Sequence, residues 1–538
     1  MICIEGIKSP IEKNTKEALK DFVMTKYHLK EKEILDFKLI KQSLDARKKD
    51  HLHYVNTIHL SLSNEKHFLK KYHSNQIYNI KEEFYTLPKK GIEPMQFRPI
   101  IVGSGPAGLF CTYLLASMGY QPILIERGEK IEDRVKSVEH FFSTGELKEN
   151  SNVQFGEGGA GTFSDGKLNT RTKDACHRKE KILDIFVECG AGEEIKYQQN
   201  PHIGTDQLRE VIIRLRQKIL KLGGKIHYNT CLTNLCIKDQ KIEAIEVNHD
   251  HIIPCSHLVL AIGHSARDTF LLLKEKGLDM EAKPFAIGLR IEHPQAMINE
   301  AQYGNKAEKL PPASYKLTYT TKKRRGVYSF CMCPGGYVVN ASSEKGHLAI
   351  NGMSYHARDG KNANSAIVVT VTKDDFGSNP LAGLSFQQRL EEHAYQEARG
   401  KIPVQLWRDY RDNRMSSSFG SIKPEIKGSY AFANLNTLFP NTINEALKEA
   451  IPYFGQKIKG FDREDAIFAG IETRTSSPIR ILRNESFESN IRGIYPCGEG
   501  SGYAGGIMSA ARDGLLIAEE IIKNYYPVQE KGGKENET

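Results

Sequence analysis

A glycine turn in the first part of the chain has the residue types and spacing of a dinucleotide site. The sequence Gly-Ser-Gly-Pro-Ala-Gly at 103–108 gives G-x-G-x-x-G, between a β-branched run at 100–102 and an apolar helical face at 109–118. The first glycine allows a tight turn, the second lets the backbone approach a pyrophosphate, and the third lets the helix pack close to the strand. The helix start presents free N–H groups to that pyrophosphate. The residues predicted to bind it are Gly103, Gly105, Pro106, Ala107 and Gly108.

The strand that follows this helix, predicted at 122–125, ends at Glu126, where an acidic side chain can hold a ribose hydroxyl. A carboxylate here favours a free 2′-hydroxyl over a 2′-phosphate, so FAD or NAD is expected rather than NADP. We expect Glu126 and the adjacent Arg127 to contact the cofactor. A chance glycine turn is the alternative, and the flanking strands and the acidic residue argue against it.

Residues 156–166 contain five glycines with polar residues between them. Glycines at this density allow unusual backbone angles and very close approach to a ligand. We interpret the stretch as a cofactor loop, although a flexible surface loop would have the same composition. Lys167 directly follows it and is a candidate to stabilise negative charge on a reduced flavin ring. The cofactor contacts expected from the loop are Gly158, Gly159, Gly161 and Thr162.

A second nucleotide-type block stands near the end of the chain. Residues 493–514 have the pattern of a strand, an acidic turn, several glycines and a helix. Glu499 is expected to bind the ribityl hydroxyls of a flavin, and the helix start at 506–507 to face the N1/O2 edge of its ring. The cofactor contacts expected here, and at the end of a strand at 257–262, are Gly263, Gly498, Glu499, Gly506 and Ile507.

The segment 284–470 lacks a nucleotide motif and shows the alternation of strands, so we predict a strand-rich substrate domain there. Its Arg290 and His293 are candidate catalytic residues, although a structural ion pair explains them equally well. Cys331 and Cys333 are predicted to point the same way on a strand. They are candidate redox or substrate-facing thiols, with two small core residues as the alternative.

The first 95 residues carry their own pattern. Strands are predicted at 2–7, 34–42, 53–62 and 80–87, and helices at 16–28 and 65–73. This βαββαβ order is that of a ferredoxin-like domain. The segment has 18 Lys and Arg against 13 Asp and Glu, so it supplies +5 of the net charge of +9. An RNA-binding surface is the alternative to a solvated charged face. The paired aromatics of RNA-recognition strands do not stand out, and a nucleic-acid partner is not expected.

At 538 residues the chain is expected to hold about three domains. The predicted units are a ferredoxin-like domain (1–95), a discontinuous FAD-binding domain (96–283 and 471–526), a substrate domain (284–470) and a disordered tail (527–538). No stretch is apolar for long enough to span a membrane, and no secretion signal is evident. The ten cysteines show no C-x-x-C pair or zinc spacing, which favours reduced thiols, a cytoplasmic location and no metal site.

Several motifs together carry a resemblance. Gly-Pro-Ala-Gly at 105–108, Ala-Ile-Gly at 261–263 and Pro-Cys-Gly-Glu at 496–499 resemble the glutathione-reductase-type FAD fold. The glycine loop, with Ile-Glu-His-Pro-Gln at 291–295 and Glu-Thr-Arg-Thr-Ser-Ser-Pro at 472–478, is similar to bacterial uncharacterised FAD-dependent dehydrogenases. The resemblance implies an α/β fold in which a Rossmann-like FAD-binding domain is interrupted by a mixed, strand-rich second domain and preceded by the α+β ferredoxin-like domain. There is no second G-x-G-x-x-G, so a dedicated NAD(P)H domain is not expected.

The expected function is that of an FAD-dependent oxidoreductase (dehydrogenase) in which non-covalent FAD exchanges a hydride with a small polar or anionic substrate. NADH or NADPH is a candidate transient electron donor. Two alternatives stay open. One is a flavin-dependent RNA-modifying protein whose first 95 residues bind RNA, and the other is a binding protein in which FAD is structural.

Overall fold

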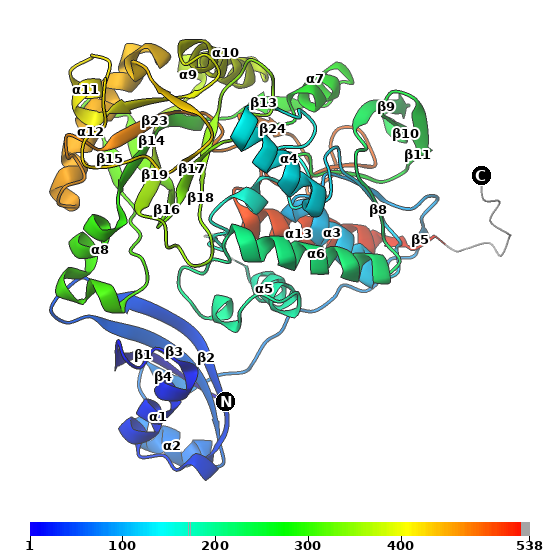
Figure 1. Cartoon of the computed structure of the whole chain (residues 1–538). Coiled ribbons are helices and arrows are strands. Elements are labelled where there is room, and N and C mark those ends of the chain that lie inside the picture. The colour runs from blue at the N-terminus through cyan, green and yellow to red at the C-terminus, as the bar shows by residue number, and fades with distance from the viewer. Residues whose placement is uncertain (171, 173, 529–538) are drawn as a thin grey trace.

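The computed structural model describes residues 1–170, 172 and 174–528, so the tail predicted for 527–538 lies outside the described residues from position 529 onward. The first unit has a four-stranded antiparallel sheet in the order β2-β3-β1-β4 (Figure 1). Its elements are β1 (Ile2–Pro10), α1 (Lys16–Tyr27), β2 (Ile34–Asp45), β3 (His53–Leu62), α2 (Glu65–Tyr72) and β4 (Ile77–Asn79). Ile58 and Leu60 of β3 pack in one core with Leu19 and Val23 of α1. The ferredoxin-like assignment of this unit stays a prediction.

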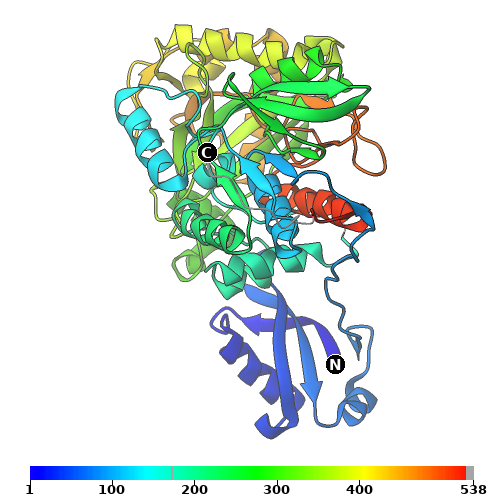
Figure 2. The ribbon, with the colours of Figure 1, turned by 90° about the vertical axis from the view of Figure 1, so that its right-hand side faces the viewer.

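The strand predicted at 80–87 is wrong. β4 ends at Asn79, and residues 80–92 run without regular structure to the next unit (Figure 2). Asn79 pairs with Ile2, and Ile80 donates its N–H to the carbonyl of Met1. The partner strand therefore ends there, and a further strand would have nothing to pair with.

A five-stranded parallel sheet in the order β25-β12-β6-β7-β8 forms the centre of the second unit. Its strands are β6 (Ile100–Val102), β7 (Ile123–Ile125), β8 (Lys225–His227), β12 (Leu258–Leu260) and β25 (Ile494–Pro496). β6, β12 and β25 are entirely buried, as apolar strands covered on both faces must be. The helices α3 (Pro106–Ser117), α6 (Thr205–Lys221) and α13 (Ile507–Asn524) lie side by side in Figure 1.

Further elements surround this sheet. The helices are α4 (Ile131–Thr144), α5 (Arg178–Glu188) and α7 (Arg267–Glu275). A separate antiparallel sheet consists of β9 (Leu232–Lys238), β10 (Lys241–Val247) and β11 (His251–Pro254). The chain leaves the unit through β13 (Met280–Ala282) and returns through β24 (Ile479–Ile481), and these two strands pair antiparallel. The second unit, which contains the predicted nucleotide-binding turn, is thus interrupted by a long insertion.

The insertion is built on a seven-stranded sheet in the order β15-β16-β19-β14-β23-β20-β22. Its strands are β14 (Phe285–Pro294), β15 (Thr318–Thr320), β16 (Gly326–Cys333), β19 (Asn362–Val371), β20 (Ile402–Leu406), β22 (Tyr430–Phe432) and β23 (Ile467–Glu472). A small sheet holds β17 (Tyr337–Asn340), β18 (Ile350–Met353) and β21 (Ile426–Lys427), and the longer helices are α8 (Gln295–Tyr303), α10 (Ala382–Glu397) and α12 (Asn441–Lys457). One face of the large sheet packs in an apolar core, and the other combines the buried Arg290 and Asn364 with a small apolar cluster.

The first unit also contacts the insertion. The turn between β2 and β3 reaches α8 in Figure 1, and Leu52 of this turn is buried in the same core as Tyr303. Among the described residues, no helix combines the length and the apolar composition that a membrane crossing requires.

Candidate cofactor and active site

Two glycines of the turn at 103–108 are required by packing. Gly103 has a φ of +99° and donates its N–H to Ile125 O at 2.8 Å. A Cβ on Gly108 would lie 1.8 Å from the carbonyl oxygen of Gly103, so α3 packs directly on the turn. Gly105 differs, because a Cβ there would meet one atom within 4 Å, Gly159 Cα at 3.9 Å. Gly105 therefore leaves room in front of the helix start, where a pyrophosphate would bind.

The glycine loop joins the starts of two helices. A Cβ on Gly159 would lie 3.0 Å from Gly105 Cα, just before α3. A Cβ on Gly161 would lie 3.1 Å from Cγ1 of Ile507, the first residue of α13. Segments that lie far apart in the sequence are thereby brought together around one space.

The other two loop residues expected to bind the cofactor face the protein. Gly158 donates its N–H to Ser104 O at 2.9 Å, and a Cβ on it would lie 2.2 Å from the Thr162 hydroxyl. Thr162 is fully buried, and its carbonyl accepts a hydrogen bond from the Thr205 hydroxyl of α6. Gly158 and Thr162 therefore stabilise the conformation of the loop through contacts with the protein.

A buried arginine that sequence reasoning missed holds this loop. Arg134 of α4 is fully buried, and burial lowers its pKa to about 9. It donates to the backbone carbonyls of Asn152, Val153, Gly156, Glu157 and Gly159. The available signal was its position on the apolar face of a helix, with Ile131 and Val138 at helical spacing.

Glu126 is also buried and ties three segments together. It accepts hydrogen bonds at 2.7–3.0 Å from the N–H and hydroxyl of Ser104 and from the N–H groups of Gly128 and Gly156. The adjacent Arg127 stacks on Phe155 at 4.5 Å and pairs with Asp268 at 2.7 Å. Glu126 therefore fastens the turn to the loop at the point where a ribose is expected.

Open space lies in front of three glycines near the ends of the parallel strands. A Cβ on Gly263, Gly505 or Gly506 would have no heavy atom within 4 Å. Gly506 directly precedes α13, whose first N–H groups have no acceptor within the helix. Glu499 lies in the same block, with its carboxylate 3.2 Å from His264 Nδ1. A glycine-lined space and two helix starts suit the pyrophosphate of a dinucleotide such as FAD, and a carboxylate such as Glu499 suits its hydroxyl groups.

Tight contacts hold α13 against α3. A Cβ on Gly514 would lie 2.1 Å from the carbonyl oxygen of Ala107, and one on Gly498 would lie 2.7 Å from Ala107 Cβ. Gly498 donates its N–H to Asp513 at 2.7 Å, and Arg483 pairs with the same carboxylate at 2.7 Å. Asp513 and Gly514 were not singled out in the sequence, because their roles depend on a helix that is distant along the chain.

Lys167 leaves the glycine loop toward the seven-stranded sheet. Its Nζ donates to the carbonyl of Met332 in β16 and lies 3.2 Å from the carboxylate of Asp165. Asp165 is buried and also pairs with Arg358. The ammonium group of Lys167 is therefore already held by the protein.

The two thiols of β16 differ in exposure although Lys167 and Arg290 act on both, and their shared orientation stays a prediction. Cys331 is exposed, with a φ of +41°, whereas Cys333 is buried and donates to the carbonyl of Cys331 at 3.3 Å. A bulge between Phe330 and Cys333 breaks the alternation of the strand. Desolvation by the surrounding protein raises the pKa of the Cys331 thiol to about 12, although the charge of Lys167 opposes this shift.

Arg290 is fully buried in β14 and fully engaged. It donates to both carboxylate oxygens of Glu472, at 2.7 and 3.0 Å, and has three further acceptors. Those acceptors are Asn351, Asn364 and the carbonyl of Cys331. Arg290 thus stabilises the bulge of β16 by its hydrogen bond to Cys331. All five of its N–H donors are used, so none is free for a substrate.

His293 lies on the opposite face of β14, because it is three residues beyond Arg290. Its Nε2 is 2.6 Å from the carbonyl of Phe461, and the centroids of the two tilted rings are 4.4 Å apart. Burial lowers its pKa to about 4. The structure therefore places His293 in the core and not beside the glycine loop.

A buried ion cluster joins the two large units. Glu391 of α10 is fully buried and pairs with Arg267 of α7 at 2.9 Å and with Arg474 at 2.8 Å. Arg267 also pairs with Glu344 at 3.2 Å. The two guanidinium groups hold the pKa of Glu391 well below its usual range, against the effect of burial. Arg474 belongs to the Glu-Thr-Arg-Thr-Ser-Ser-Pro motif, which thereby has a structural role.

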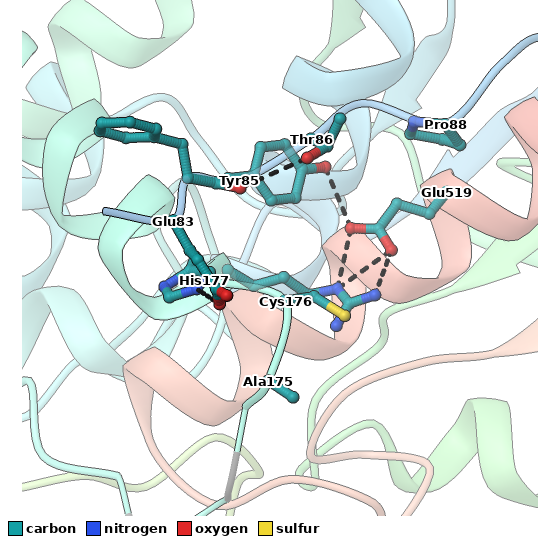
Figure 3. A pocket seen from close by; sticks show the side chains of 10 residues that line it. Glu83, Tyr85, Thr86, Pro88, Ala175, Cys176, His177 and Glu519 are labelled. Carbon is teal, nitrogen blue, oxygen red and sulfur yellow. Dashed lines mark hydrogen bonds and ion pairs between the residues drawn. The ribbon is translucent and has the colours of Figure 1, made fainter. Parts of the chain in front are cut away.

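A recess of about 480 Å³ lies between the 80–92 linker, the residues before α5, and α13 (Figure 3). Its charged side chains pair with one another, since Glu519 accepts hydrogen bonds from Tyr85 at 3.0 Å and from Arg178 at 2.8 Å. Glu519 stands three turns beyond the start of α13, roughly 18 Å along the helix. The hydrogen bonds in the recess hold the linker against α13, and the recess is separate from the cofactor space.

Comparisons with known proteins agree with this geometry. The domain described as "FAD-dependent protein, C-terminal domain-like" matches residues 284–475, an NAD(P)-binding Rossmann-like domain matches 101–158, and a domain of unknown function matches 1–61. An uncharacterized protein of Clostridium beijerinckii is 49% identical over 510 residues, which are 94% of this chain and 95% of that protein. The chain belongs to this family of FAD-dependent proteins. The predicted cofactor, FAD, and the predicted class of a Rossmann-like unit with a strand-rich second unit are thereby confirmed for this FAD-dependent protein.

Solved structures match the FAD-dependent protein only remotely. Glycine oxidase from Geobacillus kaustophilus is 10% identical, with a TM-score of 0.35, over 81% of this chain and 96% of that one. L-proline dehydrogenase from P. horikoshii is 13% identical, with a TM-score of 0.33, over 81% of this chain and 94% of that one.

Proposed function

We propose that this protein is an FAD-dependent oxidoreductase that exchanges a hydride between non-covalent FAD and a small polar or anionic substrate. The observation that carries the proposal is the open space in front of Gly263, Gly505 and Gly506, framed by the starts of α3 and α13. Two helix N-termini on one space favour a ligand with a pyrophosphate at one end and a ring that becomes anionic at the other.

FAD supplies the hydride chemistry when it is bound. The backbone of Gly105 and Ala107 would hold the pyrophosphate and Glu499 the ribityl chain, while Glu126, which already accepts four hydrogen bonds from the protein, would fix the turn beside the ribose. The N–H groups at the start of α13 would stabilise negative charge on the ring. The face of the seven-stranded sheet that bears Cys331 would close the space from the other unit and exclude water. Because Lys167 is already engaged, we propose that it ties the loop to β16.

The test is a visible spectrum of the purified protein under anaerobic conditions, before and after NADH and then NADPH. A flavin band that bleaches with one nicotinamide supports the oxidoreductase and identifies an electron donor. A band that neither reduces directs the search to alcohol and amine substrates that reduce the flavin themselves. A protein that shows no flavin after incubation with excess FAD contradicts the proposal.

A further inference from the structure

A lysine where the chain crosses between the two large units has no side-chain partner among the described residues. Lys283 links β13 to β14, where the chain crosses from the nucleotide-binding unit into the insertion. Its backbone N–H donates to Pro478 O at 2.8 Å, on the returning crossing. Its side chain is half-buried, and among the described residues no hydrogen bond, ion pair or ring contact is made by its Nζ. Lys167, by contrast, is held by Asp165 and Met332.

The segment 477–481, by which the chain returns from the insertion, directly contacts residues 499–506, which are predicted to bind the cofactor. The Ser477 hydroxyl donates to the carbonyl of Gly500 at 2.9 Å. A Cβ on Gly502 would lie 2.6 Å from the carbonyl oxygen of Ile479. Lys283 is therefore anchored, through Pro478, to the segment that packs against residues 499–506.

The charges around Lys283 come from both crossings and from the cofactor block. Burial of the ammonium lowers the pKa of Lys283, Arg480 lowers it further, and Glu499 opposes them. Arg480 pairs with Glu281 at 3.3 Å, and Glu499 lies 3.2 Å from His264. An unpaired lysine with a lowered pKa is neutral at a lower pH than an ordinary lysine, so it can accept a proton.

We propose that Lys283 is the base of the reaction, and this inference rests on the proposed function. The substrate is an alcohol or an amine. Its C–H hydrogen leaves as a hydride to FAD, the proton on its oxygen or nitrogen passes to the neutral Nζ of Lys283, and a carbon–heteroatom double bond forms. Lys283 becomes an ammonium group and returns the proton to solvent, so atoms and electrons balance.

The first test measures acetylation of each lysine of the wild-type chain by acetic anhydride, with FAD and after removal of FAD, read by mass spectrometry. Lys283 is expected to react about fivefold more slowly with FAD bound, because bound ligands bury most of the surface that they contact. Lys448 is the internal control, since burial also lowers its pKa but it lies over the Tyr410 ring in the insertion. Equal labelling of Lys283 in both states overturns the inference.

The second test follows the flavin spectrum of the loaded protein from about pH 6 to about pH 10. The wild type and Lys448→Met are expected to show a spectral transition as Lys283 titrates, and Lys283→Met is expected to lack it. An unchanged transition in Lys283→Met overturns the inference. A chain that binds no FAD at all instead contradicts the proposed function, so the two failures are distinguishable.

Discussion

On the nucleotide-binding side of the candidate site, glycines bring backbone groups to the cofactor space, whereas on the insertion side buried charged side chains pair with one another. The turn around Gly105 and the start of α13 at Gly506 leave open room and free N–H groups. Arg290 with Glu472, and Glu391 with Arg267 and Arg474, are closed ion clusters. The first side is suited to binding a ligand, and the second to holding two units in a fixed relation.

This difference has an energetic consequence. A side chain that replaces a glycine on the nucleotide-binding side either contacts backbone atoms or enters the space for the ligand. Which of stability and FAD binding is lost therefore depends on which glycine is replaced. A charge removed from the insertion side leaves its partner buried and uncompensated, which is costly wherever it occurs. The two sides should therefore respond differently in stability and in FAD binding.

Gly108→Ala is expected to have the largest effect. The new Cβ would lie 1.8 Å from Gly103 O, so α3 must move off the turn. Overpacking against backbone should cost more than about 3 kcal/mol of unfolding free energy and abolish FAD binding. Denaturant unfolding and the flavin content of the purified protein measure both. Normal stability with full flavin content would show that the helix does not depend on this contact.

Glu391→Gln is expected to lower the unfolding free energy by about 4 kcal/mol, because Arg267 and Arg474 lose the carboxylate between them. Glu392→Gln is the matched control, as Glu392 is the next residue of α10 and its hydrogen bond is exposed. Thermal or denaturant unfolding compares them. Equal stability of the two variants would contradict the role of the buried cluster.

Low pH should weaken the fold through buried histidines. Burial lowers the pKa of His202, His257 and His293 to about 4, from an unfolded value of 6.5. The unfolded state then binds more protons between these values, so each histidine lowers stability by up to about 1.4 kcal/mol per pH unit as the pH falls from about 6.5 to about 4. The slope should be shallower in His293→Gln and unchanged in His249→Gln, whose histidine is exposed. Equal slopes for all three proteins would reject this account.

Gly105→Ala sharpens the comparison within the turn. Its Cβ meets only Gly159 Cα, at 3.9 Å, so stability should change by less than about 1 kcal/mol. The dissociation constant of FAD should nevertheless rise at least about tenfold, which is about 1.4 kcal/mol, because the methyl group enters the pyrophosphate space. Fluorescence titration with FAD measures it, and unchanged affinity would place the pyrophosphate elsewhere.

Tyr85→Phe is expected to have the smallest effect. It removes the 3.0 Å hydrogen bond to Glu519 in the linker recess and should cost about 1 kcal/mol. FAD content should not change, because the recess is separate from the cofactor space. Tyr526→Phe, at an exposed position, is the control. Loss of flavin in Tyr85→Phe alone would link the linker to the cofactor site.

Short-range patterns predicted most of the nucleotide-binding unit. The strand–turn–helix around Gly103 and the late helix start at Gly506 follow from glycine spacing and apolar periodicity, which act within a few residues. The strand expected at 80–87 failed because its partner ends at Met1. The alternation read at Cys331 and Cys333 did not reveal the bulge in the pairing of β16 with β19. Both the end of the strand and the bulge depend on pairing with a distant segment.

The sequence by itself determined the cofactor class, the glycine turn and the interruption of the nucleotide-binding unit, because each has a local signature. Only the tertiary structure decided which charged residues are free. It placed Arg290 and Lys167 in closed contacts, gave the Nζ of Lys283 no partner within the described part of the chain, and showed that Arg134 holds the glycine loop. The reason is that a charged side chain is engaged or available according to the partners that folding brings to it, and those partners are distant along the chain.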